Sequence, residues 1–226
     1  MVINNPIDLH LVFYGSFILD STSQVTKIFF LYVSLLCLVP FVYLLRQSNI
    51  HAFEYSVLFL FSLFSIILIA SANDLITFYL AIELQSLSFY VLAAFKRGSG
   101  FSTEAGLKYF IIGAFSSGLF LWGCSIIYGS CGSTNYESIG RLFSIDFGQY
   151  SSICIIGLCF LIVSILFKLS AAPFHAWAPD TYEGSPLSST IIFSIFPKLP
   201  LVVALCRIMF ECFYSFNLFW EILISL

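Results

Sequence analysis

Long apolar stretches separated by short polar connections make up nearly the whole chain. A helix needs roughly 20 mostly apolar residues to cross a bilayer. Six windows meet that requirement, at approximately 28–45, 53–73, 75–95, 107–128, 152–173 and 187–210, and a further apolar stretch covers 213–226. The pattern predicts an all-α, polytopic membrane protein with about six transmembrane helices and a partial C-terminal one.

The polar residues divide this chain into four parts. Residues 1–27 carry Asp8, His10, Asp20 and Lys27 around an apolar stretch that is too short to cross a bilayer, so we interpret them as an interfacial hairpin. The first transmembrane helix and its loop form the second part, at 28–52. The remaining spans form a central unit at 53–210, and 211–226 is a C-terminal apolar segment.

Composition excludes several other classes of protein. The chain is 60% hydrophobic and only 9% charged, with a mean hydropathy of +1.00, which leaves no room for a soluble domain. Its net charge of −3 is scattered and includes no basic run, so no nucleic acid partner is expected. The seven cysteines lack CxxC spacing, the three histidines lie far apart, and no phosphate-binding glycine motif occurs. We expect no metal and no catalytic bond chemistry in this chain.

Positive charges in the connections indicate an orientation under the positive-inside rule, because alternate connections share a side of the membrane. One side carries four such charges and the other three, which places the first group inside. The first group is Arg46, Lys96, Arg97 and Lys108, and the second is Lys27, Arg141 and Arg207. Arg207 is thus interpreted only as a charge that marks one side of the membrane.

Three of the ionisable residues within the predicted spans stand out, because an ionisable group at bilayer depth costs roughly 2.5–3.5 kcal/mol on insertion scales. Glu83 is near the middle of the third span, and helical spacing places Tyr79, Ser86 and Tyr90 on its face. These residues form a polar stripe inside an apolar helix. A static ion pair or hydrogen bond between spans remains an alternative for Glu83.

Lys168 lies near the end of the fifth span, five residues before Pro173. Proline cannot donate the backbone hydrogen bond that the helix needs, so we expect a kink or break beside the lysine. His175 follows seven residues after Lys168, on nearly the same face if the helix resumes. A hydrated path is one interpretation, and the alternatives are a snorkelling lysine and an interfacial histidine.

Lys198 lies mid-span between Pro197 and Pro200, and so repeats the combination of a buried charge and irregular backbone. A purely structural role remains an alternative. Moving a carboxylate relative to a buried lysine changes which protonation state of the lysine is stable. A buried Glu and Lys pair is therefore suited to a proton pump.

The charged spans resemble one family of membrane subunits, which comprises subunit 2 of mitochondrial NADH:ubiquinone oxidoreductase and subunit N of the bacterial enzyme. Three stretches carry the resemblance: DLITFYLAIELQSLSFYVLAAFKR at 74–97, STEAGLKYFIIGAFSSGLFLWGCSIIYG at 102–129, and FKLSAAPFHAWAPDTYEGSPLSSTIIFSIFPKLPL at 167–201. Leu-Gln-Ser after Glu83 distinguishes this family from related antiporter-like subunits.

The resemblance implies an antiporter-like fold with two inverted five-helix repeats, each containing one broken helix. Residues 53–210 match the first repeat, and the sequence ends before the second. That implies either a separately encoded second half or a degenerate subunit. The family's proton relay falls on Glu83, Lys168, His175 and Lys198.

The implied function is proton translocation coupled to electron transfer from NADH to ubiquinone, in the mitochondrial inner membrane. The chain would be a non-redox subunit, with NADH, FMN, iron-sulfur clusters and ubiquinone held by partner subunits. The expected partners are other membrane-arm subunits, a chain carrying the second half, and lipids. The alternatives are a stand-alone cation/proton antiporter subunit and a structural spacer.

Overall fold

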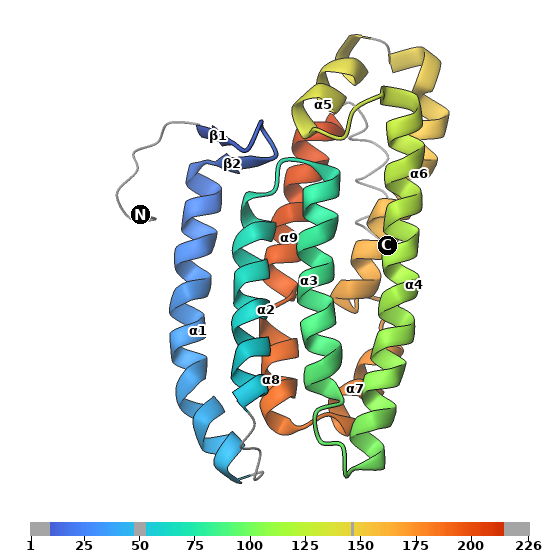
Figure 1. Ribbon diagram of the computed structural model, residues 1–226. Coiled ribbons are helices and arrows are strands. Elements are labelled where there is room, and N and C mark those ends of the chain that lie inside the picture. Colours follow the sequence, from blue (N-terminus) through green and yellow to red (C-terminus); the bar gives the residue numbers. More distant parts are fainter. Residues whose placement is uncertain (1–9, 48–52, 146, 215–226) are drawn as a thin grey trace.

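The computed structural model describes residues 10–47, 53–145 and 147–214, which form a bundle of helices with a small hairpin at one end (Figure 1). The elements are β1 (His10–Val12), β2 (Phe17–Leu19), α1 (Ser21–Gln47), α2 (Phe53–Ser71), α3 (Leu75–Ala93), α4 (Gly100–Cys131), α5 (Tyr136–Ile145), α6 (Phe147–Leu169), α7 (Trp177–Gly184), α8 (Leu187–Ile195), α9 (Lys198–Arg207) and the π-helix η1 (Ile208–Cys212). The predicted partial C-terminal helix lies almost wholly outside the described residues.

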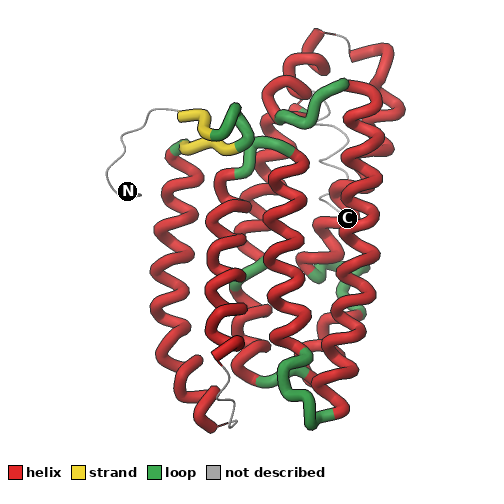
Figure 2. Tube along the Cα trace, viewed as in Figure 1, coloured by secondary structure: helices red, strands yellow, loops and turns green. Residues whose placement is uncertain are grey.

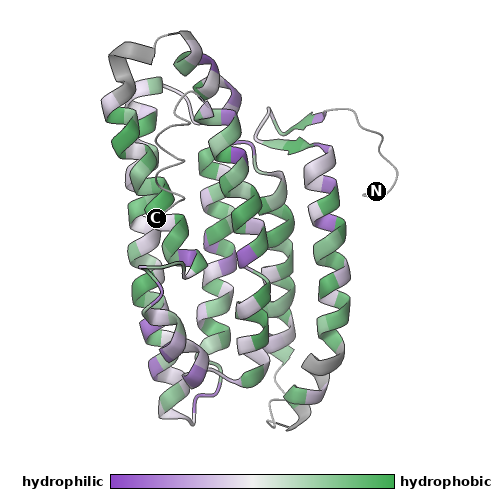
Figure 3. Cartoon of the chain, turned by 180° about the vertical axis from the view of Figure 1, so that it is seen from behind, coloured by the Kyte–Doolittle hydropathy of each residue, from purple (hydrophilic) through white to green (hydrophobic). Residues whose placement is uncertain are grey.

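Six helical segments of the described chain are long and apolar enough to cross a membrane, and each overlaps one of the six predicted spans. They are Ser21–Leu38, Phe53–Ser71, Leu75–Ala93, Gly100–Cys131, Ser152–Leu169 and Leu187–Cys212. Apolar residues line these helices along most of their length (Figure 3). The prediction of an all-α multi-pass membrane protein is confirmed.

The first helix begins earlier than the sequence pattern indicated. Residues 21–27, which we assigned to the N-terminal interfacial segment, form the first turns of α1. Asp20 accepts a hydrogen bond from the Ser23 amide at 2.8 Å, and the Asp20 amide donates to the Ser23 hydroxyl at 3.1 Å. This reciprocal capping begins a helix within a polar stretch that hydropathy alone excludes.

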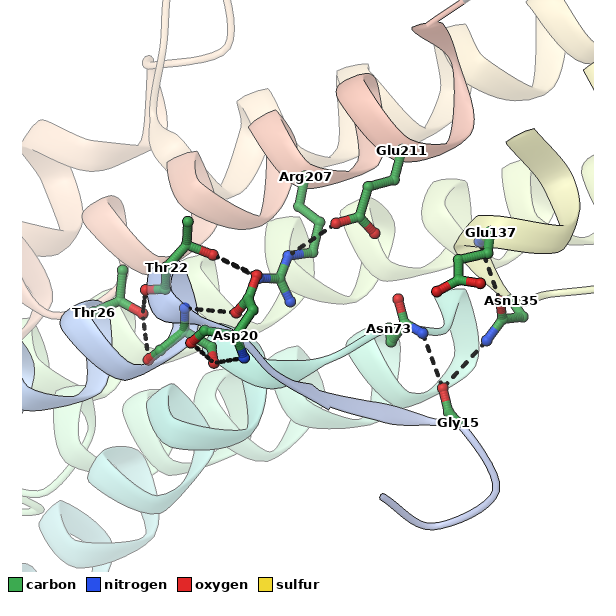
Figure 4. Close-up of polar contacts among 10 residues, drawn as sticks. Gly15, Asp20, Thr22, Thr26, Asn73, Asn135, Glu137, Arg207 and Glu211 are labelled. Carbon is green, nitrogen blue, oxygen red and sulfur yellow. Dashed lines mark hydrogen bonds and ion pairs between the residues drawn. The ribbon is translucent and has the colours of Figure 1, made fainter. Parts of the chain in front are cut away.

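Before Asp20, β1 and β2 pair antiparallel, with His10 opposite Leu19 and Val12 opposite Phe17. Two residues outside the hairpin hold the turn between these strands. The Gly15 carbonyl accepts hydrogen bonds from the side-chain amides of Asn73 and Asn135 at 3.1 and 3.2 Å. These two asparagines follow α2 and α4 in the chain, so the hairpin joins both connections at one end of the bundle (Figure 4).

Helices α4 and α6 form the most extensive helix pair in the fold. Gly123 and Gly157 face one another there. A Cβ on Gly123 would lie 2.8 Å from the Gly157 carbonyl oxygen, and one on Gly157 would lie 3.2 Å from the Gly123 carbonyl oxygen. The absence of side chains at both positions is what permits the two backbones to come this close.

Two helices break within the bundle, as loop segments partway along its length show (Figure 2). The first break confirms the prediction near Lys168: α6 ends at Leu169 and α7 starts at Trp177. The Trp177 indole N–H donates to the Phe167 carbonyl at 3.1 Å, which satisfies a carbonyl freed by the break. The second break divides the predicted sixth span into α8, α9 and η1.

Candidate proton-transfer site

Glu83 and Lys168 form an ion pair inside the bundle. Glu83 lies midway along α3, and Lys168 lies in the last turn of α6, one residue before that helix ends. The Lys168 ammonium donates to Glu83 Oε1 at 3.2 Å, and the two side chains are only 13% and 21% exposed. The structure therefore brings together two of the four predicted relay residues, from positions 85 residues apart in the chain.

Two small cavities are lined in part by Lys168. The larger has a volume of about 20 Å³ and the smaller about 10 Å³. A cavity needs roughly 10–15 Å³ to hold a water molecule, so the larger has room for one. Polar groups line both: Gln85, Ser86, Tyr90 and Ser116 the larger, and Tyr79, Ser117 and Ser164 the smaller.

Gln85 also belongs to this site, although in the sequence it served only to mark the resemblance to a family. It is 3% exposed, and its side-chain nitrogen finds no hydrogen-bond partner among the described residues. A buried amide donor of this kind is normally satisfied, often by an ordered water. Its position in an apolar helix, two residues after Glu83, was the signal in the sequence.

Tyr90 closes the larger cavity on one side. Its ring meets the Tyr109 ring edge-on at 4.9 Å between centroids, and Tyr109 in turn stacks on Trp177 at 5.0 Å. This series of rings connects α3, α4 and the start of α7. The site is thereby packed against the segment that follows the broken helix.

Lys198 is the first residue of α9 and is partly buried. Its neighbours Pro197 and Leu201 line the larger cavity beside Lys168, while Lys198 does not. No hydrogen bond or ion pair of the Lys198 side chain occurs with any other residue that the structure describes. The helix carrying Lys198 thus borders the Lys168 cavity, although the two lysines are not in contact.

His175 lies in the turn between α6 and α7, where its side chain is exposed. We expected it in register with Lys168 if the helix resumed directly. The helix does not resume until Trp177, because Ser170 adopts a φ of 54° and the chain turns before Pro173. The carbonyl of His175 accepts a hydrogen bond from the Ala178 amide at 3.0 Å, which begins α7.

The structure contains a second charged cluster that the sequence pattern did not predict. Arg207, which we had counted as a charge marking one membrane side, is 8% exposed and donates to Asp20 Oδ2 at 2.7 Å. Lys27, counted on the same side, is 6% exposed. A signal was present, because Arg207 and Glu211 are four residues apart in an otherwise apolar stretch.

No group of three or more His, Cys, Asp or Glu side chains suited to a metal ion occurs in the part of the chain that the structure describes. The cysteines are all free thiols. What the site offers is a buried acid and base, polar side chains and room for water. Such an arrangement can hold and transfer protons.

Comparison with known proteins places this chain in a family. A sequence profile described as "NADH:quinone oxidoreductase/Mrp antiporter, TM" matches residues 72–226. The NADH-ubiquinone oxidoreductase chain 2 of Marchantia polymorpha is 46% identical over 219 residues, which are 95% of this chain and 45% of that protein.

Two solved structures have similar folds. Respiratory complex I from Thermus thermophilus with bound aureothin gives a TM-score of 0.69 at 31% identity, over 87% of this chain and 42% of the matched chain. The Mrp complex from Dietzia sp. DQ12-45-1b gives 0.76 at 20% identity, over 91% of this chain and 39% of that one, which shows the fold alone. The chain spans about half the length of the relatives it matches. It is a multi-pass membrane protein, and it belongs to the NADH:quinone oxidoreductase/Mrp antiporter transmembrane family.

Proposed function

We propose that this chain is a membrane-arm subunit of mitochondrial NADH:ubiquinone oxidoreductase and relays protons through Glu83, Lys168, His175 and Lys198. The observation that carries the proposal is the buried Glu83 and Lys168 pair beside a cavity with room for one water. A charge at bilayer depth is costly unless it is paired, so such pairs typically mark ion or proton pathways. The high identity to a relative named for ubiquinone supports the assignment.

In this proposal, the distance between the Glu83 carboxylate and the Lys168 ammonium determines whether the lysine keeps its proton. While Glu83 lies beside Lys168, the ammonium is stabilised by the carboxylate. Moving the carboxylate away leaves a buried ammonium without its counter-charge, which favours release of the lysine proton. The cavity bordered by Pro197 and Leu201 lies on the side of Lys168 toward which that proton would pass, to the helix of Lys198.

His175 would connect the relay to the surroundings of the chain. Its imidazole is exposed and follows directly after the helix break. An exposed imidazole can give protons to water and take them from it, so this side chain is suited to proton exchange with the surroundings. Lys108 on α4 and Asp180 on α7 form an exposed ion pair at 2.8 Å near this turn.

Electron transfer would take place in partner subunits that bind NADH, FMN, iron-sulfur clusters and ubiquinone. This chain would contribute no redox group. Other membrane-arm subunits and a chain carrying the second half of the longer relatives are its proposed protein partners. The mitochondrial inner membrane is its proposed location.

The test is Lys168→Met in the assembled complex, reconstituted into vesicles, with protons translocated per electron as the measurement. We expect this ratio to fall at least severalfold, because methionine is an unbranched side chain nearly as long as lysine but has no proton to pass. Lys96→Met is the matched control, since Lys96 is exposed in a connection. An unchanged ratio in Lys168→Met would rule out the relay.

A second candidate is a stand-alone cation/proton antiporter subunit, which is favoured by the matching family profile, whose description includes Mrp antiporters. The two candidates differ in the proteins that accompany the chain. Mass spectrometry of its native membrane complex would find flavin and iron-sulfur subunits in the first case and only antiporter-type membrane subunits in the second. A structural spacer, the third candidate, predicts normal coupling in the double variant Glu83→Gln/Lys168→Met.

A further inference from the structure

The second charged cluster lies at the end of the bundle that carries the hairpin and α5 (Figures 1 and 4). It forms where the start of α1 meets the end of α9. Arg207 is at its centre: one terminal nitrogen donates to Asp20 Oδ2 at 2.7 Å and to Thr22 Oγ1 at 2.9 Å, and its Nε lies 3.6 Å from Glu211 Oε1. One guanidinium thus forms ion pairs with two carboxylates.

The two carboxylates are held differently. Asp20 also accepts hydrogen bonds from the Thr22 hydroxyl at 2.7 Å and the Ser23 amide at 2.8 Å. Burial opposes its ionisation, but the hydrogen bonds from Thr22 and Ser23 and the charge of Arg207 outweigh it and hold the pKa of Asp20 below its ordinary value. Asp20 is therefore a fixed anion that fastens Arg207.

Glu211 has the weaker hold on the same arginine. Its 3.6 Å approach to the guanidinium exceeds ordinary hydrogen-bond length, and its second oxygen, Oε2, is buried without a partner among the described residues. A buried carboxylate oxygen without a partner is costly, and a proton on that oxygen removes most of the cost. Of the two carboxylates, Glu211 is the one placed to take up and release a proton.

Two further polar atoms near Glu211 are buried and unsatisfied within the described chain: Arg207 Nη1 and the Tyr136 hydroxyl. Burial raises the pKa of Tyr136 well above its ordinary value, so its hydroxyl keeps its proton and remains a donor. Buried atoms of this kind are normally satisfied by ordered water. Arg207 and Glu211 also line a groove of about 590 Å³, together with residues of α1 such as Thr22 and Thr26 and residues of α9 such as Val202.

The backbone at Glu211 is also unusual. Residues Ile208–Cys212 form a π-helix directly after α9. Single π turns are rare, and they occur frequently at functional sites because they displace side chains from the regular helical register. The segment from Lys198 through Glu211 is therefore one helical stretch with an irregular start and an irregular end, roughly 20 Å long.

We propose that Glu211 is a further proton-carrying residue, at the hairpin end of the helix that begins at Lys198, and that Asp20 and Arg207 position it. This inference rests on the proposed function. The groove between α1 and α9, which reaches from Glu211 to Val202 one turn beyond Lys198, supplies space for the water that would connect them. The charged and titratable groups around Glu211 are Asp20 before α1, Tyr136 and Glu137 on α5, Arg207 on α9 and Cys212 on η1. Lys27 on α1 interacts in turn with Asp20 and Arg207.

The experiment compares Glu211→Gln with the wild type in the reconstituted complex. We expect NADH-to-ubiquinone electron transfer to persist while protons translocated per electron fall at least twofold, with Glu211→Asp restoring most of the ratio. Glu54→Gln is the matched control, an exposed glutamate on the spanning helix α2. An unchanged ratio in Glu211→Gln would overturn the proposal.

Should Glu211→Gln fail to assemble, Glu211→Asp decides, because it keeps the charge next to Arg207. A shifted pH dependence of pumping in that variant supports a proton-carrying role, and an unshifted one overturns it. Lys168→Met is measured in parallel. A loss of pumping in Lys168→Met with none in Glu211→Gln refutes this inference alone, whereas normal pumping in Lys168→Met refutes the relay on which it rests.

Discussion

The phenol of Tyr90 on α3 lies directly against the bare backbone of Gly113 on α4. A Cβ at position 113 would overlap the Tyr90 hydroxyl and ring carbons. Because Tyr90 closes the cavity beside Lys168, the missing side chain on one helix shapes the surroundings of a charged residue on another. The spacing of Gly113 and Ser117 is that of ordinary close helix packing, but here the glycine accommodates an aromatic side chain.

We expect Gly113→Ala to force the Tyr90 ring out of place and to destabilise the protein by about 1–3 kcal/mol, the usual cost of overpacking. The measurement is thermal unfolding of the protein purified in detergent with the subunits that accompany it. Gly118→Ala is the control, because Gly118 lies on the same helix with open space around its Cα. There the change should be neutral or stabilising by up to about 1 kcal/mol. Equal effects of the two substitutions would contradict this account of Gly113.

The Glu83 and Lys168 pair should show energetic coupling. Glu83→Gln alone leaves the buried ammonium without its anion, and breaking a buried pair from one side costs about 3–5 kcal/mol. The double variant Glu83→Gln/Lys168→Met removes both charges and should be less destabilised than the sum of the two single variants, by about 1–3 kcal/mol. A double-mutant cycle of unfolding free energies measures this coupling. Strict additivity would mean that the 3.2 Å contact contributes nothing.

Hydropathy predicted the spans and Pro173 predicted the first break. Both features depend on residues that are close together in the sequence. Twenty apolar residues need a membrane wherever they occur, and Pro173 interrupts its helix through its own missing donor. Pairings between distant residues leave no such trace. Arg207 and Asp20 are 187 residues apart, and Asp20 lies in a polar stretch that hydropathy assigns to the interface. For this one reason, the predicted start of the first helix was wrong and the Arg207 cluster was not predicted.

Asp20 should make stability depend on acidity. Its pKa in the folded protein lies below the ordinary value, so its stabilisation is fully present above the unfolded-state pKa of about 4 and is lost as the pH falls through the folded-state pKa. Asp20→Asn should therefore lower stability at neutral pH by about 3–5 kcal/mol and flatten the loss of stability below about pH 4. Thermal unfolding across that pH range is the measurement.

The matched control for Asp20→Asn is Asp180→Asn, at a carboxylate whose side chain is 58% exposed in its ion pair with Lys108. Exposed pairs contribute about 0–1 kcal/mol, so this change should be small. If Asp20→Asn kept the same acid sensitivity as the wild type, the hydrogen bonds from Thr22 and Ser23 would not be holding Asp20 ionised.

The crossing of α4 and α6 supports the site indirectly, because α6 carries Lys168 and α4 carries the Gly113 face. Gly157→Val should push these helices apart, since even a Cβ there lies 2.9 Å from Ile127 and 3.2 Å from the Gly123 carbonyl oxygen. Backbone cannot retreat as a side chain can, so we expect a loss of several kcal/mol and much less assembled protein. Gly129→Val, at an exposed position of α4 with open space, is the control. Because the pair at Lys168 spans α3 and α6, any Gly157→Val protein that does assemble should also pump fewer protons per electron. Normal assembly and pumping would show that the close approach of Gly123 and Gly157 does not position α6.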